Sequence, residues 1–339
     1  MRRAGQLMPQ ILEPDNLRLA FWKASRGKRY SKAVLKYQLN LDDNLEKLGS
    51  QISTGLVEVG DYHYFRIFEP KERQICASAF SEQVLHHAMM NVCHDIFERH
   101  LVHDTYATRK GKGVYAALLR AGEFTRTNRY YLKLDVRKFF DSVHHDTLMM
   151  QLSRLFREQK VLEIFHKITD SYEASPGRGL PIGNLTSQYF ANHFLSGLDH
   201  HIKEELRLRA YVRYMDDMVL WSNEKEVLER ALVSISGFIH DRLHCRLKPV
   251  VLEKCGRGLS FLGYRLFPAI IILNRQSKQR FIKKIRMVEE KYDSGLWAES
   301  ECQRRALPLI AFLDHARTRN FRKTVLLGQW SNTVRATTV

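Results

Sequence analysis

Two adjacent acidic residues, Asp216 and Asp217, stand between two short runs of apolar and aromatic residues. Tyr, Val, Leu and Trp favour a pleated, half-buried surface, so residues 211–221 are predicted to form a tight β-hairpin with both carboxylates at or beside its tip. Two like charges held against apolar residues are unfavourable unless a cation neutralises them. The hairpin therefore indicates a divalent-metal site, and the alternative is a solvated turn that contains two aspartates.

A third carboxylate lies at the end of another predicted strand. Residues 131–136 alternate Leu and Val with Tyr, Lys and Asp, and this pattern predicts a strand that ends at Asp135. An aspartate that closes a strand often serves as a helix cap. Asp135, however, precedes two aromatic residues and can face the 216–217 hairpin. Three carboxylates would then converge on two adjacent antiparallel strands.

The charge of the chain points to a polyanionic partner. The 339 residues include 54 Lys and Arg against 37 Asp and Glu, a formal net charge of +17. Phosphate contacts supply most of the affinity of sequence-independent nucleic-acid binding, so nucleic acid is the favoured partner. A basic protein of the membrane surface is the competing interpretation, and no long amphipathic segment or polybasic tail supports it. The length is consistent with two or three domains.

The cysteines and the apolar runs bear on the cellular compartment. The five cysteines are scattered, odd in number and without a CxxC pair, so they are expected to be reduced thiols and to form neither a disulfide framework nor a zinc site. The first residues contain no apolar stretch typical of a signal peptide. The longest apolar run, 266–273, contains Pro268 and is too short to span a bilayer. We expect a soluble, intracellular protein without a membrane partner.

Several other elements can be predicted along the chain. Residues 1–60 are predicted to form basic helices. Residues 62–75 are predicted to form a strand, a turn and a second strand that carries Lys71 and Arg73 on one face. A loop at 178–188 contains Gly179 and Gly183, which allow a ligand to approach the backbone closely. This loop is expected to open a helix over 189–207, with Thr186 or Ser187 as its cap. Further on, the sequence predicts a helix over 225–243, a strand pair over 258–266 and a basic helix from 277.

Five of these stretches, in this order, resemble the motif series of reverse transcriptases over about residues 60–320. They are Leu134-Asp135 with Phe139-Phe140, Leu180-Pro181-Ile182-Gly183, Tyr214-Met215-Asp216-Asp217, Lys248, and Phe261-Leu262-Gly263-Tyr264. The resemblance implies an α+β right-hand polymerase fold: an antiparallel-sheet palm, fingers and a helical thumb. The implied division is a basic helical extension at 1–60, fingers at 61–130, palm at 131–265 with part of the fingers at about 155–185, and thumb at 266–339.

The resemblance also implies roles for individual residues. Asp135 and Asp216 would bridge two Mg²⁺ ions, for which Mn²⁺ is a possible substitute, with Asp217 completing or supporting the site. The carbonyl of Val136 would be a further ligand, and Lys248 would protonate the leaving pyrophosphate. The substrate-binding residues would be Lys71 and Arg73 on the triphosphate, Phe140 against a ribose 2′-hydroxyl, and Ile182, Gly183 and Gln188 in the 178–188 loop.

The sequence of the 178–188 loop indicates which group of reverse transcriptases the chain resembles. Most reverse transcriptases carry Gln where this chain has Ile182 and Pro where it has Gln188, and the form seen here is similar to the enzymes of diversity-generating retroelements. Those enzymes copy a template-repeat RNA into cDNA with frequent errors opposite adenines. The likeness implies template RNA, primer, deoxynucleoside triphosphates and a small basic accessory variability protein as partners, in the cytoplasm of a bacterium or as a phage product.

Four alternatives stay open, from two classes of protein. A defence-associated, retron-like or group II intron-like reverse transcriptase would share the metal site without adenine-biased errors. From a different class, a silent polymerase fold could serve as an RNA-binding scaffold. The intact Asp135, Asp216 and Asp217 argue against that last interpretation.

Overall fold

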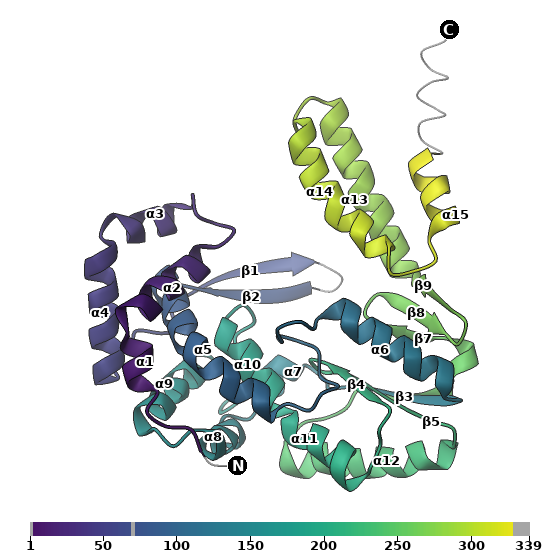
Figure 1. Cartoon of the computed structure of the whole chain (residues 1–339), viewed down its shortest axis with the longest axis horizontal. Helices are drawn as coiled ribbons and strands as arrows, with labels where there is room; N and C mark the ends of the chain where they lie inside the picture. The colour runs from purple at the N-terminus through teal and green to yellow at the C-terminus, as the bar shows by residue number, and fades with distance from the viewer. Residues whose placement is uncertain (1–2, 69–71, 328–339) are drawn as a thin grey trace.

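The computed structural model describes residues 3–68 and 72–327. Short helices form the N-terminal layer of the molecule, as the sequence predicts (Figure 1). Their apolar residues, such as Leu17 and Phe21, are buried in a core that continues through the central part of the chain. The helices are α1 (Met8–Leu12), α2 (Pro14–Ser25), α3 (Lys32–Leu39) and α4 (Leu41–Thr54).

A two-stranded hairpin and two long helices follow. Strands β1 (Tyr62–Phe68) and β2 (Glu72–Ser78) pair antiparallel from Tyr62 opposite Ser78 to Phe68 opposite Glu72, which confirms the predicted strands. Residues 69–71, which include Lys71 and the predicted turn, lie outside the described residues. Helix α5 (Phe80–His100) packs its apolar stripe into the core, and α6 (Val114–Thr127) precedes the central sheet.

The central sheet has four antiparallel strands in the order β4-β5-β3-β6. The predicted hairpin is confirmed as β4 and β5, joined by a tight turn in which Met215 has a φ of +56°. Asp135, the last residue of β3, is paired with Asp217, the first residue of β5. The strands are β3 (Tyr130–Asp135), β4 (Tyr211–Tyr214), β5 (Asp217–Ser222) and β6 (Val251–Lys254).

The two faces of this sheet are covered differently. Leu134 and Met218 point into the large helical core that contains Phe194 and Ile239. Side chains alternate along a strand, so Asp135 and Asp217 point to the opposite face. The helical elements that follow β3 and β5 are α7 (Phe139–Ser142), α8 (His145–Leu155), α9 (Gln159–Asp170), α10 (Leu185–Phe194), α11 (Ser196–His200), the π-helix η1 (His201–Glu205), α12 (Lys225–Gly237) and the π-helix η2 (Phe238–Arg242).

The start of α10 corrects one prediction. The helix expected from residue 189 begins at Leu185, and neither Thr186 nor Ser187 caps it. Thr186 is buried and lies 3.2 Å from a ring nitrogen of His86, so its hydroxyl is engaged with α5 across the core. The helix expected to continue to 207 is interrupted at Leu195 and resumes as α11 and η1.

A second sheet and a helical hairpin complete the chain. The predicted strand pair is confirmed as β7 and β8, and a third strand extends it. Figure 1 shows α13 and α14 lying side by side on the same side of the central sheet as the β1–β2 hairpin. The elements are the 3₁₀ turn η3 (Cys255–Arg257), β7 (Leu259–Phe261), β8 (Tyr264–Phe267), β9 (Ile270–Leu273), α13 (Arg275–Asp293), α14 (Glu299–Leu313), α15 (Arg319–Arg322) and the π-helix η4 (Lys323–Leu327).

The cysteines are free and buried, as expected for reduced thiols. Among the helices within residues 3–68 and 72–327, none has the length and apolar character needed to cross a bilayer.

Candidate active site

The three aspartates meet at one end of the central sheet. Asp135 closes β3 and Asp217 opens β5, and the two residues are direct partners across antiparallel strands. Asp216 occupies the turn immediately before β5. The predicted meeting of three carboxylates on two adjacent antiparallel strands is therefore present in the structure, at the end of the sheet where β3 leads into α7.

Two lysines neutralise two of these carboxylates. Lys248 Nζ donates to Asp135 Oδ1 at 2.5 Å, and the backbone N–H of Lys248 donates to the Asp135 carbonyl at 2.8 Å. Lys133 Nζ lies 3.1 Å from Asp217 Oδ1 and donates to its Oδ2 at 3.3 Å. Lys133 was missing from the predicted site. Its position two residues before Asp135 on one strand face was the signal that could have found it.

Burial and mutual repulsion change the acidity of the remaining carboxylates. Burial, and then the charge of Asp135, raise the pKa of Asp216 to about 6. Burial also raises the pKa of Asp217, and the ammonium group of Lys133 opposes that rise. A cation placed between these side chains would favour their ionised forms, because it offsets both the desolvation and the repulsion.

The donor set fits a hard divalent cation. Asp217 Oδ1 is a buried oxygen that accepts no hydrogen bond from the described residues, although Lys133 is within ion-pair distance. Carboxylate and carbonyl oxygens are the ligands that Mg²⁺ takes in proteins. Within the described part of the chain, no three His, Cys, Asp or Glu side chains are gathered tightly enough to hold a metal as they stand. Lys133 and Lys248 each hold one of these carboxylates in an ion pair.

A buried ion pair supports the turn that carries Asp216. Arg213 of β4 is fully buried, and its Nε and Nη2 donate to Asp199 of α11 at 2.7 and 2.5 Å. Its Nη1 donates to Asn192 Oδ1 at 2.8 Å and to the Met215 carbonyl at 3.0 Å. Arg213 thus bonds directly to the residue before Asp216, and it connects the turn to α10 and α11 behind the sheet.

Val136 is the residue after Asp135, at the same end of the sheet. Its backbone forms an antiparallel bridge with Leu247, and its side chain is fully buried. The chain around 246–248 is thereby held alongside the end of β3, which places Lys248 next to Asp135. Asp135, Val136, Asp216, Asp217 and Lys248 are thus brought together by the fold.

The 178–188 loop lies against the β1–β2 hairpin. The backbone N–H of Cys76 in β2 donates to the Ile182 carbonyl at 2.8 Å. Gly183 has a φ of +135°, and a Cβ at this position would lie 2.7 Å from the Cys76 carbonyl oxygen. A larger residue at 183 would therefore push the loop away from β2. Arg73 is exposed on the same strand, three residues before Cys76.

Phe140 and Gln188 occupy different positions relative to this loop. The Phe140 carbonyl accepts a hydrogen bond of 2.8 Å from the backbone N–H of Leu180, so α7 connects the aspartate end of β3 to the loop. The Phe140 ring is half-buried and packs edge-on to Phe139. Gln188 is exposed on α10, where its Oε1 lies 3.5 Å from the hydroxyl of Thr108.

Comparison with known proteins shows which family the sequence matches. The sequence profile of the family described as reverse transcriptase (RNA-dependent DNA polymerase) matches residues 70–266. The chain is 20% identical to the putative COX1/OXI3 intron 1 protein of Saccharomyces cerevisiae over 174 residues, which are 48% of this chain and 21% of that protein. It is 23% identical to protein YkfC of Escherichia coli over 250 residues, 59% of this chain and 66% of YkfC.

Among solved structures, apo telomerase from Candida tropicalis is similar in fold. The TM-score is 0.50 at 11% sequence identity, and the match covers 70% of this chain and 54% of the telomerase chain. The likeness confirms the predicted α+β right-hand polymerase fold. The chain spans from about a fifth to two thirds of the length of these curated relatives and about half of the telomerase chain.

Proposed function

We propose that this chain, which belongs to the reverse transcriptase (RNA-dependent DNA polymerase) family, copies RNA into DNA by extending a primer with deoxynucleoside triphosphates. The pairing of Asp135 with Asp217 across β3 and β5, with Asp216 in the adjoining turn, is the observation that carries the proposal. Template RNA, primer and cDNA are its nucleic-acid partners, and the net charge of +17 supports binding of these polyanions.

The proposed chemistry depends on charge neutralisation and positioning. The carboxylates of Asp135, Asp216 and Asp217 and the carbonyl of Val136 would hold Mg²⁺, or Mn²⁺ in its place. Bound divalent ions neutralise phosphate charge and lower the pKa of the attacking 3′-hydroxyl. Lys248 would transfer an ammonium proton to the leaving pyrophosphate, and its contact with Asp135 supports a position beside the metal-binding residues.

The substrate side of the site is proposed to lie between β2 and the 178–188 loop. Arg73, and Lys71 beside it in the sequence, would bind the triphosphate through charge-assisted hydrogen bonds. Ile182 and Gly183 would lie close to the templating base pair, because their loop packs directly on β2. Gln188 would contribute from α10. We keep the division into an N-terminal extension, fingers, palm and thumb, with the sequence-based boundaries, as part of this proposal.

Primer extension on an RNA template that contains all four bases tests the proposed function. We expect Mg²⁺-dependent cDNA that is lost on chelation and restored by Mg²⁺ or Mn²⁺. Absence of product, with RNA binding retained, would favour an RNA-binding scaffold in its place. Sequencing of the cDNA then separates the finer possibilities.

Phe140→Ala is expected to relax selection against ribonucleotides. Removal of the ring takes away the group proposed to clash with a ribose 2′-hydroxyl, and pocket discrimination of this kind is worth roughly 1–3 kcal/mol, or about 10–200-fold. The ratio of kcat/KM for dCTP and CTP measures the effect. Phe140→Tyr, which keeps the ring, should retain the selectivity of the unmodified chain. Unchanged sugar selectivity in Phe140→Ala would assign the ring to core packing alone.

We further propose that the enzyme serves a diversity-generating retroelement and copies a template-repeat RNA with errors at adenines. The Ile182 and Gln188 departures from most reverse transcriptases support this. A small basic accessory variability protein would assist it in the cytoplasm of a bacterium or a phage-infected cell. Group II intron-like reverse transcription is the second candidate, because intron-encoded yeast proteins are among the relatives. Error spectra distinguish the two.

Ile182→Gln is expected to lower misincorporation opposite template adenine by about tenfold. The backbone of residue 182 is held by Cys76, so the exchange alters the side chain near the proposed base pair and leaves the loop in place. A polar group that bonds around a correct pair adds roughly 1–3 kcal/mol of discrimination. cDNA sequencing measures the spectrum, with Ile182→Val as a control that keeps an apolar branch. An identical spectrum in Ile182→Gln would remove residue 182 from the explanation of fidelity.

A further inference from the structure

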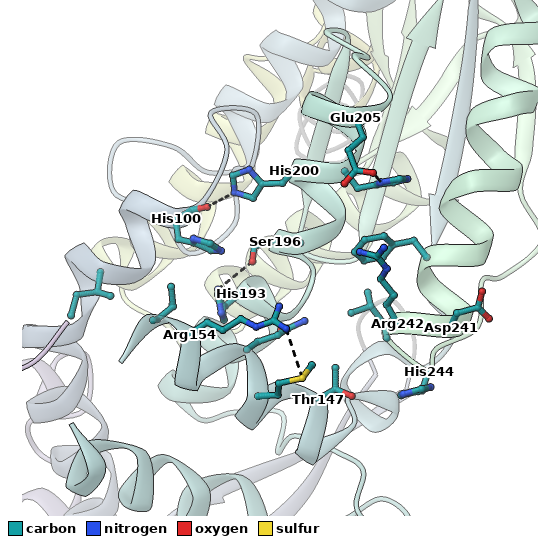
Figure 2. Close-up of a pocket in the computed structure, with 18 of the residues that line it drawn as sticks. His100, Thr147, Arg154, His193, Ser196, His200, Glu205, Asp241, Arg242 and His244 are labelled. Carbon is teal, nitrogen blue, oxygen red and sulfur yellow. Dashed lines mark hydrogen bonds and ion pairs between the residues drawn. The ribbon is translucent and has the colours of Figure 1, made fainter. Parts of the chain in front are cut away.

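A large cavity lies among the helices behind the central sheet, away from the aspartates. Its volume is about 860 Å³, within the range of about 300–1,000 Å³ typical of small-molecule sites. The walls come from α5, α8, α10, α11, η1 and η2. Figure 2 shows Arg154 on the α8 wall, Arg242 on the η2 wall and His193 on the α10 wall of one open cavity. None of the aspartates of the candidate active site lines it.

The rim of the cavity carries guanidinium groups without carboxylate partners. Arg99, Arg154 and Arg242 form no ion pair with any carboxylate in the described part of the chain. Within the described residues the hydrogen bond of Arg154 is to the sulfur of Met150, and Arg242 lies over the ring of Phe238. Since guanidinium groups bind phosphate oxygens with strong, directional hydrogen bonds, this rim is suited to a phosphate-bearing ligand.

The carboxylates on the same walls are already engaged. Glu205 lies 2.8 Å from His201 Nδ1, and Asp241 lies 2.7 Å from His240 Nδ1. Both carboxylates stay exposed and anionic, so a phosphate would have to approach the cavity from the side of the arginines.

The floor of the cavity carries buried polar atoms that lack a partner. His193 is 3% exposed; its Nδ1 lies 3.2 Å from the Ser196 hydroxyl, and its Nε2 has no partner within the described residues. Gln151 donates through Nε2 to the Phe194 carbonyl, whereas its buried Oε1 accepts nothing from the described residues. Buried polar atoms are rarely left unbonded, and both residues line the cavity, so a ligand with hydrogen-bonding groups would satisfy them if their side chains turned toward it.

The histidines of this cavity do not form a metal site. No metal-binding group of three His, Cys, Asp or Glu is present within residues 3–68 and 72–327. Both ring nitrogens of His200 are engaged, one with Glu204 and the other with the carbonyl of His100. The ligand is therefore better sought among organic phosphates than among metal ions.

We infer that this cavity is a second nucleotide-binding site, which takes a ribonucleotide unit of RNA outside the catalytic cleft. The rim arginines would bind the phosphate. Gln151 Oε1 is closed to solvent in this structure, and a turn of its side chain toward the cavity would let it accept from a ribose hydroxyl or a base amino group. Inorganic phosphate offers fewer donors for the floor, and a phospholipid headgroup would need an exposed apolar surface beside the rim. Burial lowers the pKa of His193 to about 3, so its ring is neutral near pH 7 and acts by hydrogen bonding.

RNA is the favoured source of this nucleotide because the chain carries a net charge of +17 and the cavity is not lined by Asp135 or Asp217. A segment of a long template bound there would be held while another segment is copied. The inference depends on the proposed function only for the identity of the ligand as RNA. A free ribonucleotide shares the same chemistry, and the experiment distinguishes it.

Cross-linking and binding to the full chain test the inference. Single-stranded RNA that contains 4-thiouridine is cross-linked in the presence of a chelator, and the attached peptides are mapped by mass spectrometry. We expect cross-links in residues 147–155 or 238–244, in addition to those in the catalytic cleft. Cross-links confined to the cleft would overturn the inference.

Charge-removing variants supply the second measurement. Arg154→Gln combined with Arg242→Gln should weaken RNA binding at least fivefold, by fluorescence anisotropy at fixed salt, and leave extension of a short primer–template unchanged. The matched control, Arg126→Gln with Arg230→Gln, removes two exposed charges elsewhere and should change binding less than twofold. Equal losses in both double variants would show general electrostatics and refute a site.

AMP binding, measured by calorimetry, separates the two sources of the nucleotide. Tight AMP binding that the Arg154/Arg242 double variant loses, with RNA affinity unchanged, would replace RNA by a free nucleotide and overturn our assignment. If the Arg154/Arg242 double variant binds and copies RNA as well as the unmodified chain, the inference about the cavity is refuted and the proposed function stands. Failure of the unmodified chain to bind any RNA would refute the proposed function with it.

Discussion

Asp216→Asn is expected to abolish DNA synthesis, with a loss of at least about a thousandfold in the rate of primer extension. The substitution removes one of the three carboxylates proposed to hold the divalent ions, and loss of such electrostatic stabilisation is worth several kcal/mol, at about 1.4 kcal/mol for each factor of ten. Single-turnover extension at saturating Mg²⁺ measures the loss. Asp43→Asn, an exposed change on α4, should leave the rate unaltered.

Stability measurements show whether that loss is chemical or structural. The pKa of Asp216 is raised to about 6 by burial and by Asp135, so its ionised form destabilises the metal-free protein. The folded state binds the extra proton between about pH 4 and pH 6, and stability falls as pH rises through that window. In chelator, Asp216→Asn should therefore have a Tm at pH 7.5 equal to or above that of the unmodified chain. Substantial synthesis by a folded Asp216→Asn protein would contradict the assigned role.

Arg213→Met is expected to lower the free energy of unfolding by about 3–5 kcal/mol and to abolish measurable synthesis. The variant leaves the fully buried Asp199 carboxylate without its cation, and an uncompensated buried charge is strongly destabilising. It also removes the hydrogen bond to the Met215 carbonyl, next to Asp216. Denaturant unfolding measures the stability and primer extension measures the activity.

A second variant separates the ion pair from the turn. Arg213→Met with Asp199→Asn removes both charges, and the Asn side chain can still accept the hydrogen bond from the Tyr211 hydroxyl. We expect this double variant to recover most of the stability, because the buried charge is gone. Its synthesis should stay low, because the Met215 carbonyl still lacks its donor. Near-normal activity of the double variant would limit Arg213 to a structural role.

Local patterns in the sequence were sufficient for the strands that carry the chemistry. Alternation of apolar and polar residues located β3 and its final Asp135, and β-favouring residues on both sides of Asp216 located the β4–β5 hairpin. Both signals depend on neighbours in the chain, so they are visible without a structure. The family resemblance likewise depended on short motifs whose order survives in the sequence.

Contacts between distant segments were decided only by the tertiary structure. In the sequence, Arg213 stands in an apolar run. Only the fold shows that Asp199 and Asn192, from other helices, accept its hydrogen bonds in the core. Helix α10 starts earlier than predicted, and Thr186, expected as its cap, lies inside it and reaches His86 across the core.

In the candidate active site and in the cavity behind the central sheet, the sequence likewise determined one part and the tertiary structure the other. The sequence by itself determined which residues could bind metal and phosphate, since side-chain chemistry is a property of each residue. Only the tertiary structure decided that Lys133 and Lys248 bind two of the aspartates and that Arg154 and Arg242 share a cavity. The physical reason is that these pairs are separated by about 80 to 115 residues, and packing of the whole core sets which of them meet.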